Sequence, residues 1–204
     1  MYPSCIGFEY QGAEMIVTGT GAGLVGVSAK DGRVLWTNSE FAGNTFNCPT
    51  PVFSDGYVFW SNGSRMKGGI CLKMKVEGDK VAAEEVWKTK DMANFHGGFI
   101  VHEGCIYGGH GNGWVCLDLK TGDKKASGRL PIRRGSICFA DGMLYLFSEM
   151  GGQAGLVTCA PDKMEMKGSF TVAGEGPSYA HPVVTGGRLY LRYNTNLYCF
   201  DIKS

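Results

Sequence analysis

The sequence lacks the features of a membrane-spanning or nucleic-acid-binding protein. No apolar run approaches the roughly 18 to 20 residues that cross a bilayer, so we expect no membrane span. Residues 1–5 lack the basic stretch that opens a signal peptide, so we also expect no signal peptide in this chain. Its 20 Lys and Arg residues balance 19 Asp and Glu residues, which leaves no strong positive field to attract a polyanion. Nucleic-acid binding is therefore not expected.

The eight cysteines lack the spacings of metal sites. No Cys-x-x-Cys pair occurs, and no two cysteines are adjacent. Cys71, Cys116 and Cys199 share one position of the repeat described below, so we expect each to be a small buried filler with a free thiol. This number of free thiols favours a reducing compartment.

What the sequence has in abundance is glycine, 32 of 204 residues, placed between short alternating apolar segments. Residues 23–32 align without a gap with residues 113–122, and residues 196–204 fit the same frame. A small residue recurs in this frame at spacings of 45, 45, 42 and 41 residues, which defines a notch position occupied by Gly26, Cys71, Cys116, Thr158 and Cys199.

Each repeat predicts four short strands. Turn pairs such as Asp55-Gly56 and Asp141-Gly142 stand between apolar strands, and no segment has a helical period. Four strands in roughly 43 residues are typical of a β-propeller blade. We therefore predict an all-β fold, a single β-propeller over 1–204 built from four-stranded antiparallel blades, about five in number with four complete and one partial. The predicted blades are 2–38, 44–90, 94–130, 133–172 and 177–204.

The partial last blade leaves two arrangements open. Five blades can close into a ring, since propellers typically have four to eight. Alternatively, the blades form an open arc, a partial propeller whose two end blades expose apolar sheet faces. The open arc calls for a missing N-terminal half or for self-association through the terminal blades, most simply as a two-fold dimer.

The repeat also resembles a known family. The recurring Gly-x-Leu/Val-x-Gly/Cys-Leu-Asp-x-Lys-Thr-Gly, with Trp36 and Trp87 closing two blades, resembles the quinoprotein-type (PQQ-like) β-propeller repeat. The segments 94–98, 107–111, 178–182 and 187–192 are similar to the C-terminal half of bacterial PQQ-binding-like propeller proteins. The resemblance implies an exported, periplasmic or otherwise extracytoplasmic protein of about twice this length. Many such propellers bind no quinone and act as scaffolds, among them a lipoprotein of outer-membrane protein assembly.

The family name alone points to PQQ and Ca²⁺ as cofactors. Quinoprotein dehydrogenases require an acidic base beside the quinone and a Ca²⁺ ion held by carboxylate and amide oxygens. Six of the 19 acids occupy repeat turns, where we expect them to accept hydrogen bonds from backbone NH groups: Asp31, Asp55, Glu103, Asp118, Asp141 and Asp201. The remaining acids, such as Asp91, Glu149 and Glu175, form no spaced pair that would hold Ca²⁺. We therefore expect no cofactor and no metal.

Histidine and arginine gather where the innermost strands begin. His96 and His181 each precede a predicted innermost strand, and Arg133 and Arg134 occupy the comparable stretch of another repeat. Innermost strands line the channel of a propeller, so these side chains converge on what we call the channel mouth. A polar funnel there can hold an anionic or hydroxyl-rich ligand. The candidate ligand-binding residues are Asn47, Asn94, His96, Arg133, Arg134, Ser178, Tyr179 and His181.

Two interpretations of the channel mouth remain open. Its polar side chains either bind a ligand or only satisfy carbonyl groups of the inner strands. Two functions also remain open. The first is a non-catalytic binding or scaffold module that binds a protein partner or a small polar ligand. The second is a quinoprotein-type oxidoreductase, or another enzyme, that uses the His and Arg side chains of the channel mouth. We favour the scaffold and assign no catalytic residue, because no nucleophile elbow or dinucleotide fingerprint occurs.

Overall fold

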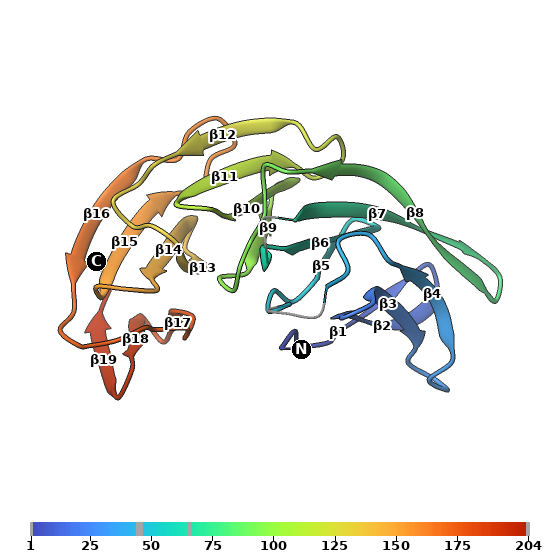
Figure 1. Ribbon diagram of the computed structural model, residues 1–204, viewed down its shortest axis with the longest axis horizontal. Coiled ribbons are helices and arrows are strands. Elements are labelled where there is room, and N and C mark those ends of the chain that lie inside the picture. Colours follow the sequence, from blue (N-terminus) through green and yellow to red (C-terminus); the bar gives the residue numbers. More distant parts are fainter. Residues whose placement is uncertain (1, 44–46, 65–66, 203–204) are drawn as a thin grey trace.

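The fold is a series of five antiparallel β-sheets arranged as an open arc (Figure 1). The computed structural model describes residues 2–43, 47–64 and 67–202. Four of the sheets have four strands each and the last has three. The all-β fold predicted from the repeat is thereby confirmed, as are the four-stranded blades and the partial propeller.

The strands follow one another along each sheet in chain order, from the concave side of the arc to its outer side. The first sheet holds β1 (Ile6–Tyr10), β2 (Ala13–Thr20), β3 (Gly23–Ser28) and β4 (Val34–Asn38). The second holds β5 (Val52–Ser54), β6 (Tyr57–Asn62), β7 (Gly68–Glu77) and β8 (Lys80–Thr89). The third holds β9 (Phe99–His102), β10 (Cys105–His110), β11 (Gly113–Asp118) and β12 (Lys124–Gly128). The fourth holds β13 (Gly135–Ala140), β14 (Met143–Ser148), β15 (Gln153–Thr158) and β16 (Met166–Thr171), and the fifth holds β17 (Val183–Thr185), β18 (Arg188–Tyr193) and β19 (Asn196–Asp201).

The inner hairpins turn on pairs of residues in the left-handed region. Asp55 and Gly56 have φ angles of 51° and 79°, and Glu103 and Gly104 have φ angles of 47° and 73°. Two consecutive positive φ angles are the type I′ geometry, whose twist matches that of the flanking strands. The acidic residue and the glycine of these two predicted turns therefore adopt the left-handed backbone conformation that a tight hairpin requires.

The core lies between neighbouring sheets. Met15, Val17 and Leu24 of the first sheet pack against Trp60 and Leu72 of the second, and all five are buried. Similar layers join the second sheet to the third, the third to the fourth and the fourth to the fifth. Each interior sheet is thus apolar on both faces, which explains why its strands contain apolar runs rather than strict alternation.

One position of the predicted repeat needs correction. Gly26 pairs with Val17, and the residue that makes the equivalent pair with Tyr145 in the fourth sheet is Leu156, not Thr158. A bulge follows Gly26 and Leu156 alike. Because the fourth sheet holds a large residue at its notch position, a search for recurring small residues shifted the alignment there by two.

The expectation for the cysteines holds only in part. All eight are free, and Cys71 and Cys116 are buried at their notch positions. Cys199 occupies the same position but is exposed, because the described residues form no further sheet against the outer face of the fifth.

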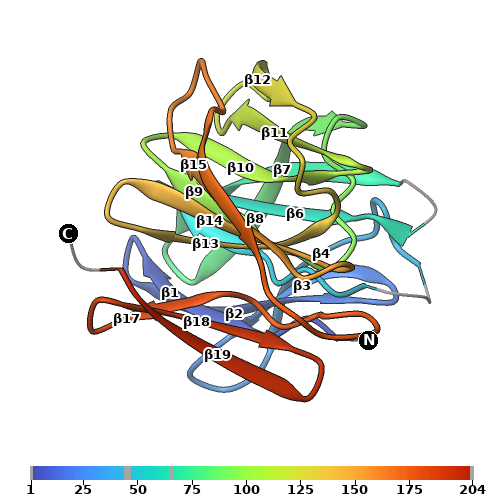
Figure 2. The same cartoon turned by 90° about the vertical axis from the view of Figure 1, so that its left-hand side faces the viewer.

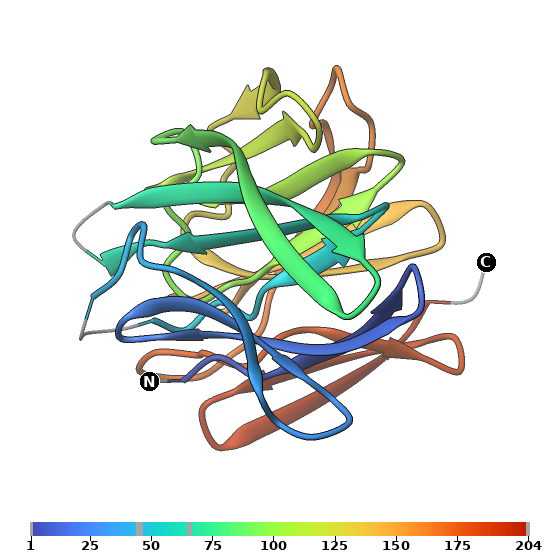
Figure 3. The ribbon, with the colours of Figure 1, turned by 90° about the vertical axis from the view of Figure 1, so that its right-hand side faces the viewer.

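The two ends of the arc leave apolar side chains uncovered. Ile16 and Val34 on the first sheet are 37% and 61% exposed, whereas Val183 and Leu197 on the fifth are 51% and 71% exposed. Figure 2 views the molecule from the end that carries β17–β19, and Figure 3 views it from the end that carries β1–β4. The structure therefore has the form of an open arc. No helix within the described residues could span a bilayer.

Candidate functional site

The candidate site lies at the channel mouth, where loops lead into the innermost strands β9, β13 and β17 (Figure 1). The loop of residues 94–98 is closed by Asn94, which is 2% exposed. The Asn94 Oδ1 accepts a hydrogen bond from the Gly98 nitrogen at 3.1 Å, and its Nδ2 donates to the Gly98 oxygen at 2.9 Å. The Asn94 side chain therefore holds the two ends of the loop together, and both polar atoms of its amide already have hydrogen-bond partners.

Glycines allow this loop to approach the neighbouring sheet. A Cβ atom on Gly97 would lie 1.7 Å from the Gly135 carbonyl oxygen at the start of β13. The Gly97 oxygen accepts a hydrogen bond from the Ile137 nitrogen at 3.2 Å, so the loop is bonded to β13. Only glycine permits this contact, which fixes the position of the loop relative to Arg134.

Arg134 and Glu149 form the charged centre of the mouth. The Arg134 Nε is paired with the Glu149 carboxylate, and the Arg134 guanidinium carbon lies 4.8 Å from the centroid of the Phe95 ring. The Glu149 side chain is 10% exposed and the Arg134 side chain 47%. No hydrogen bond within the described residues engages the Nη groups of Arg134. These donors are therefore available to a ligand.

His96 lies beside this pair and is buried, with 9% exposure. Both of its ring nitrogens lack a hydrogen-bond partner within the described residues. Tyr179 packs edge-on against the imidazole with ring centroids 5.2 Å apart. Burial lowers the pKa of His96 below its usual value, and Arg134 and His181 lower it further while Glu149 raises it. His96 is accordingly a neutral buried ring at pH 7.

His181, in the segment that leads into β17 of the fifth sheet, contacts the same loop. Its Nε2 lies 3.4 Å from the His96 carbonyl oxygen, although the His181 side chain is exposed. A Cβ atom on Gly98 would lie 3.0 Å from the His181 ring. The fifth sheet thus contacts the loop that carries His96.

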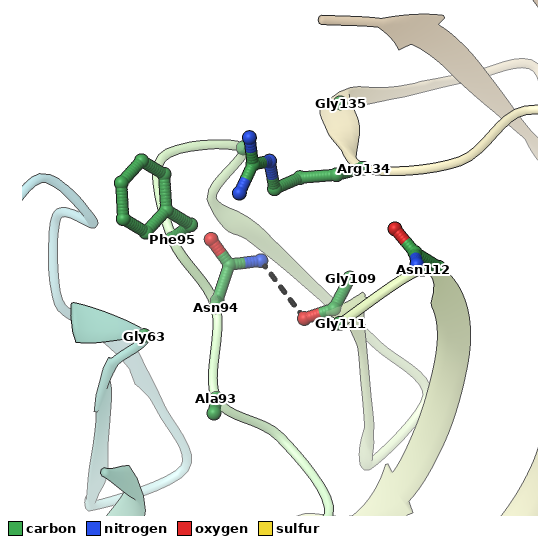
Figure 4. Close-up of a pocket in the computed structure, with 10 residues that line it drawn as sticks. Gly63, Ala93, Asn94, Phe95, Gly109, Gly111, Asn112, Arg134 and Gly135 are labelled. Atoms are coloured by element: carbon green, nitrogen blue, oxygen red, sulfur yellow. Dashed lines mark hydrogen bonds between the residues drawn. The ribbon is translucent and has the colours of Figure 1, made fainter. Parts of the chain in front are cut away.

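A small cavity of about 130 Å³ opens next to Arg134. Figure 4 shows Arg134, Phe95 and Asn94 around it, with Asn112 on the opposite side. Glycine backbone forms much of the remaining wall. The cavity therefore presents a cationic fork and a side-chain amide within a rigid backbone frame.

The structure does not bring all the candidate residues together. Asn47 is 1% exposed and donates to the Thr20 oxygen at 2.9 Å while accepting from Asn62 at 2.6 Å, so it joins the first two sheets instead. Arg133 is exposed and does not line the cavity. Ser178 is buried and donates to the Arg192 oxygen at 2.6 Å.

Sequence reasoning missed three residues. It treated Glu149 only as a leftover acid, although Gly135 pairs with Ser148 across the β13–β14 hairpin, so the register of this hairpin places Glu149 opposite Arg134. It did not single out Asn62, which bonds Asn47, or Asn112, which lies in a hairpin turn rather than before an inner strand. No sequence signal places Asn112 at the cavity, because the cavity is also lined by Gly63 and Arg134, which adjoin strands of the second and fourth sheets.

The residues at the mouth do not fit a quinone with Ca²⁺. Glu149 is the acid beside Arg134 and is already paired with it, whereas Ca²⁺ takes six to eight oxygen ligands. Within the part of the chain that the structure describes, no three His, Cys, Asp or Glu side chains group to hold a metal.

Solved structures share this fold at low sequence identity. BamB from Moraxella catarrhalis superposes with a TM-score of 0.66 at 11% identity, over 90% of this chain and 54% of that chain. The computationally designed Ika8 protein gives 0.67 at 9% identity, over 96% and 57%. AztD from Citrobacter koseri gives 0.61 at 13% identity, over 99% and 57%. The chain thus spans little more than half the length of these structures.

Family membership follows from the sequence. No curated protein sequence matches the chain. The profile of the family described as outer membrane protein assembly factor BamB, which is of the PQQ-like type, matches residues 7–126. These residues cover nearly all of the first three sheets, which contain the notch residues Gly26, Cys71 and Cys116 and both closing tryptophans. The chain therefore belongs to the BamB family of PQQ-like β-propellers.

Proposed function

We propose that the protein is a non-catalytic binding module that holds a carboxylate group of a partner protein in the cavity beside Arg134. The observation that supports this proposal is that Arg134 lines a preformed cavity and that no hydrogen bond among the described residues engages its Nη groups. The family is named for outer-membrane protein assembly, so we place the protein outside the cytoplasm and its partner among envelope proteins.

The size of the cavity favours an anchoring side chain over a free cofactor. Pockets for small molecules commonly enclose about 300–1,000 Å³. The cavity beside Arg134 encloses about 130 Å³. A carboxylate with one or two methylene groups fits such a volume, and the rest of a partner protein would then rest on the rim.

The chemistry of the cavity favours a carboxylate. An arginine fork binds a carboxylate through charge-assisted hydrogen bonds, which are roughly twice as strong as neutral ones. Glu149 engages Nε and the Phe95 ring lies against the guanidinium, so the Nη groups are oriented before a ligand arrives. The side-chain amide of Asn112 lines the opposite side of the cavity. Preorganisation of this kind reduces the entropic cost of binding.

N-acetyl-glutamate amide tests the proposal, with N-acetyl-glutamine amide as the uncharged comparison. Titration followed by NMR should show millimolar binding of the first compound only. Arg134→Gln should weaken this binding at least about tenfold, since hydrogen bonds to charged groups contribute about 1.5–3 kcal/mol.

Arg133→Gln is the matched control. Arg133 has the same charge, is exposed and adjoins Arg134, but it does not line the cavity. Its substitution should leave the binding unchanged. If Arg134→Gln unfolds the protein, the double variant Arg134→Gln/Glu149→Gln removes both charges of the pair and serves instead. Equal effects at Arg133 and Arg134 would contradict the proposal.

A further inference from the structure

A second hollow of about 520 Å³ adjoins the cavity beside Arg134, and we call it the outer groove. Residues of β10, β11 and β12 form most of its lining. Gly111 and Asn112, in the turn between β10 and β11, line both the cavity and the outer groove, so the two hollows share a wall. A polypeptide segment that places one side chain in the cavity therefore has a lined path beyond it.

Arg129 brings an unpaired positive charge to the outer groove. It lines the groove and is exposed. No hydrogen bond or ion pair among the described residues engages its guanidinium. The other cation of the groove, Lys124, is already paired with Asp91 at 3.0 Å. The net charge of the groove is therefore positive and is carried by Arg129.

His110 also lines the outer groove. Its Nδ1 accepts a hydrogen bond from the Ala93 nitrogen at 3.2 Å. Because a neutral imidazole carries a single proton, that proton then lies on Nε2. No hydrogen bond among the described residues engages this Nε2. A carboxylate oxygen bound in the groove is a suitable acceptor for it.

Arg129 and Arg134 stand at the two ends of one connection, residues 129–134 between β12 and β13. The connection is held against β11, since the Ile132 oxygen accepts a hydrogen bond from Trp114 Nε1 at 2.8 Å and Ile132 is fully buried. The Cα atoms of the two arginines are at most about 18 Å apart, because a chain extends no more than about 3.6 Å per residue. One extended segment is therefore long enough to reach both arginines.

We propose that the polypeptide bound at the channel mouth is an extended segment with two acidic residues, one held at Arg134 in the cavity and the other at Arg129 and His110 in the outer groove. This inference rests on the carboxylate binding proposed above and names the class of segment that is bound. Opposite charge at both ends of the connection fixes the position of the segment. The second carboxylate binds at the high effective concentration that its linkage to the first one sets.

The probe is the peptide Ac-Glu-Ser-Gly-Ser-Glu-NH2, whose glutamate Cα atoms lie about 13 Å apart when the peptide is extended. Two comparison peptides replace either the first or the second glutamate with glutamine. The quantity measured, by titration followed by NMR, is the affinity of the two-glutamate peptide relative to the tighter of the comparison peptides. It should be at least about tenfold, whereas two carboxylates that compete for one site would give only about twofold.

Arg129→Gln should reduce this ratio to about two. Arg129 is exposed and has no partner among the described residues, so its substitution removes no contact of the folded chain. Arg133→Gln is the matched control, because Arg133 is exposed in the same connection but lines neither the cavity nor the outer groove. It should keep the tenfold ratio. The nitrogen resonance of His110 Nε2 should shift more with the two-glutamate peptide than with either comparison peptide.

The outcomes separate this inference from the proposed function. If N-acetyl-glutamate amide binds but the ratio in the original protein is about two, the second carboxylate site is rejected and the first is kept. A ratio that falls equally in Arg129→Gln and Arg133→Gln also rejects the second site, because a general loss of positive charge then explains it. If neither the amide nor any of the three peptides binds, both the proposed function and this inference are overturned.

Discussion

At the scale of single residues, Arg134 has a structural role that His181 lacks. Arg134→Ala leaves the Glu149 carboxylate largely buried and unpaired. We expect the free energy of unfolding to fall by about 1–3 kcal/mol, below the cost of breaking a fully buried pair because the Arg134 side chain is about half exposed. His181→Ala, at an exposed residue with one long contact, should cost less than about 1 kcal/mol. Urea denaturation measures both, and equal losses would contradict this assignment.

His96 predicts a pH dependence of stability. Burial lowers its pKa below the usual value of 6.5, so the unfolded chain binds a proton more readily than the folded chain. The stabilising contribution is therefore complete above about pH 6.5 and is lost as the pH falls toward the lowered pKa. The groups around the ring are Glu149, Arg134 and His181. Lowering the pH from about 7.5 to 5.5 should reduce the melting temperature more in the original protein than in His96→Gln. An identical reduction would mean that His96 does not titrate in this way.

At the scale of elements, the contact between the 94–98 loop and β13 depends on the absence of a side chain. Gly97→Ala would place a Cβ atom 1.7 Å from the Gly135 oxygen. We expect a loss of about 2 kcal/mol or more, because both partners are backbone and neither can move away alone. Gly168→Ala in β16 is the control, since nothing lies within 4 Å of its Cβ position and its φ is not positive. That substitution should leave the denaturation midpoint unchanged or slightly raised. Similar midpoints for both variants would contradict the close contact.

At the scale of the whole molecule, the uncovered ends of the arc predict self-association. Leu197 and Val34 lie on opposite ends and are 71% and 61% exposed. We expect light scattering to show concentration-dependent association, most simply a dimer, because burying such surface is favourable. Leu197→Glu and Val34→Glu made separately would show which end is in contact. A stable monomer at micromolar concentration would contradict this expectation.

Much of the fold could be predicted from the sequence because it is local and repeated. Asp55-Gly56 and similar pairs specify tight hairpins, and the alternation beside them gives short strands. The repeat then requires sheets that bury their faces against one another. The alignment failed only at Leu156, where the notch position holds a large residue opposite Gly168. In the first sheet the small residue, Gly26, lies on the third strand and the large one, Trp36, on the fourth, whereas in the fourth sheet the two sizes are reversed. The sequence of one strand does not reveal which residue it pairs with.

The candidate site was less accessible to sequence reasoning. His96 and Arg134 were identified because each stands before an innermost strand. The lack of partners for the His96 nitrogens could not be predicted, since it depends on loops from different sheets. The pairing of Arg134 with Glu149 lies within the β13–β14 hairpin, and it was missed because the register of that hairpin was not predicted. Asn47 was grouped with them by its place in the repeat, but its amide joins the first two sheets.

The sequence by itself determined the secondary structure, the four-stranded unit and the family, because hairpin turns and notch positions act over a few residues. Only the tertiary structure decided that the five sheets form an open arc, that Cys199 is exposed and that Arg134 lines a cavity. These properties depend on which sheets are neighbours and on what each side chain meets across them, and the order of residues within one sheet carries no such information.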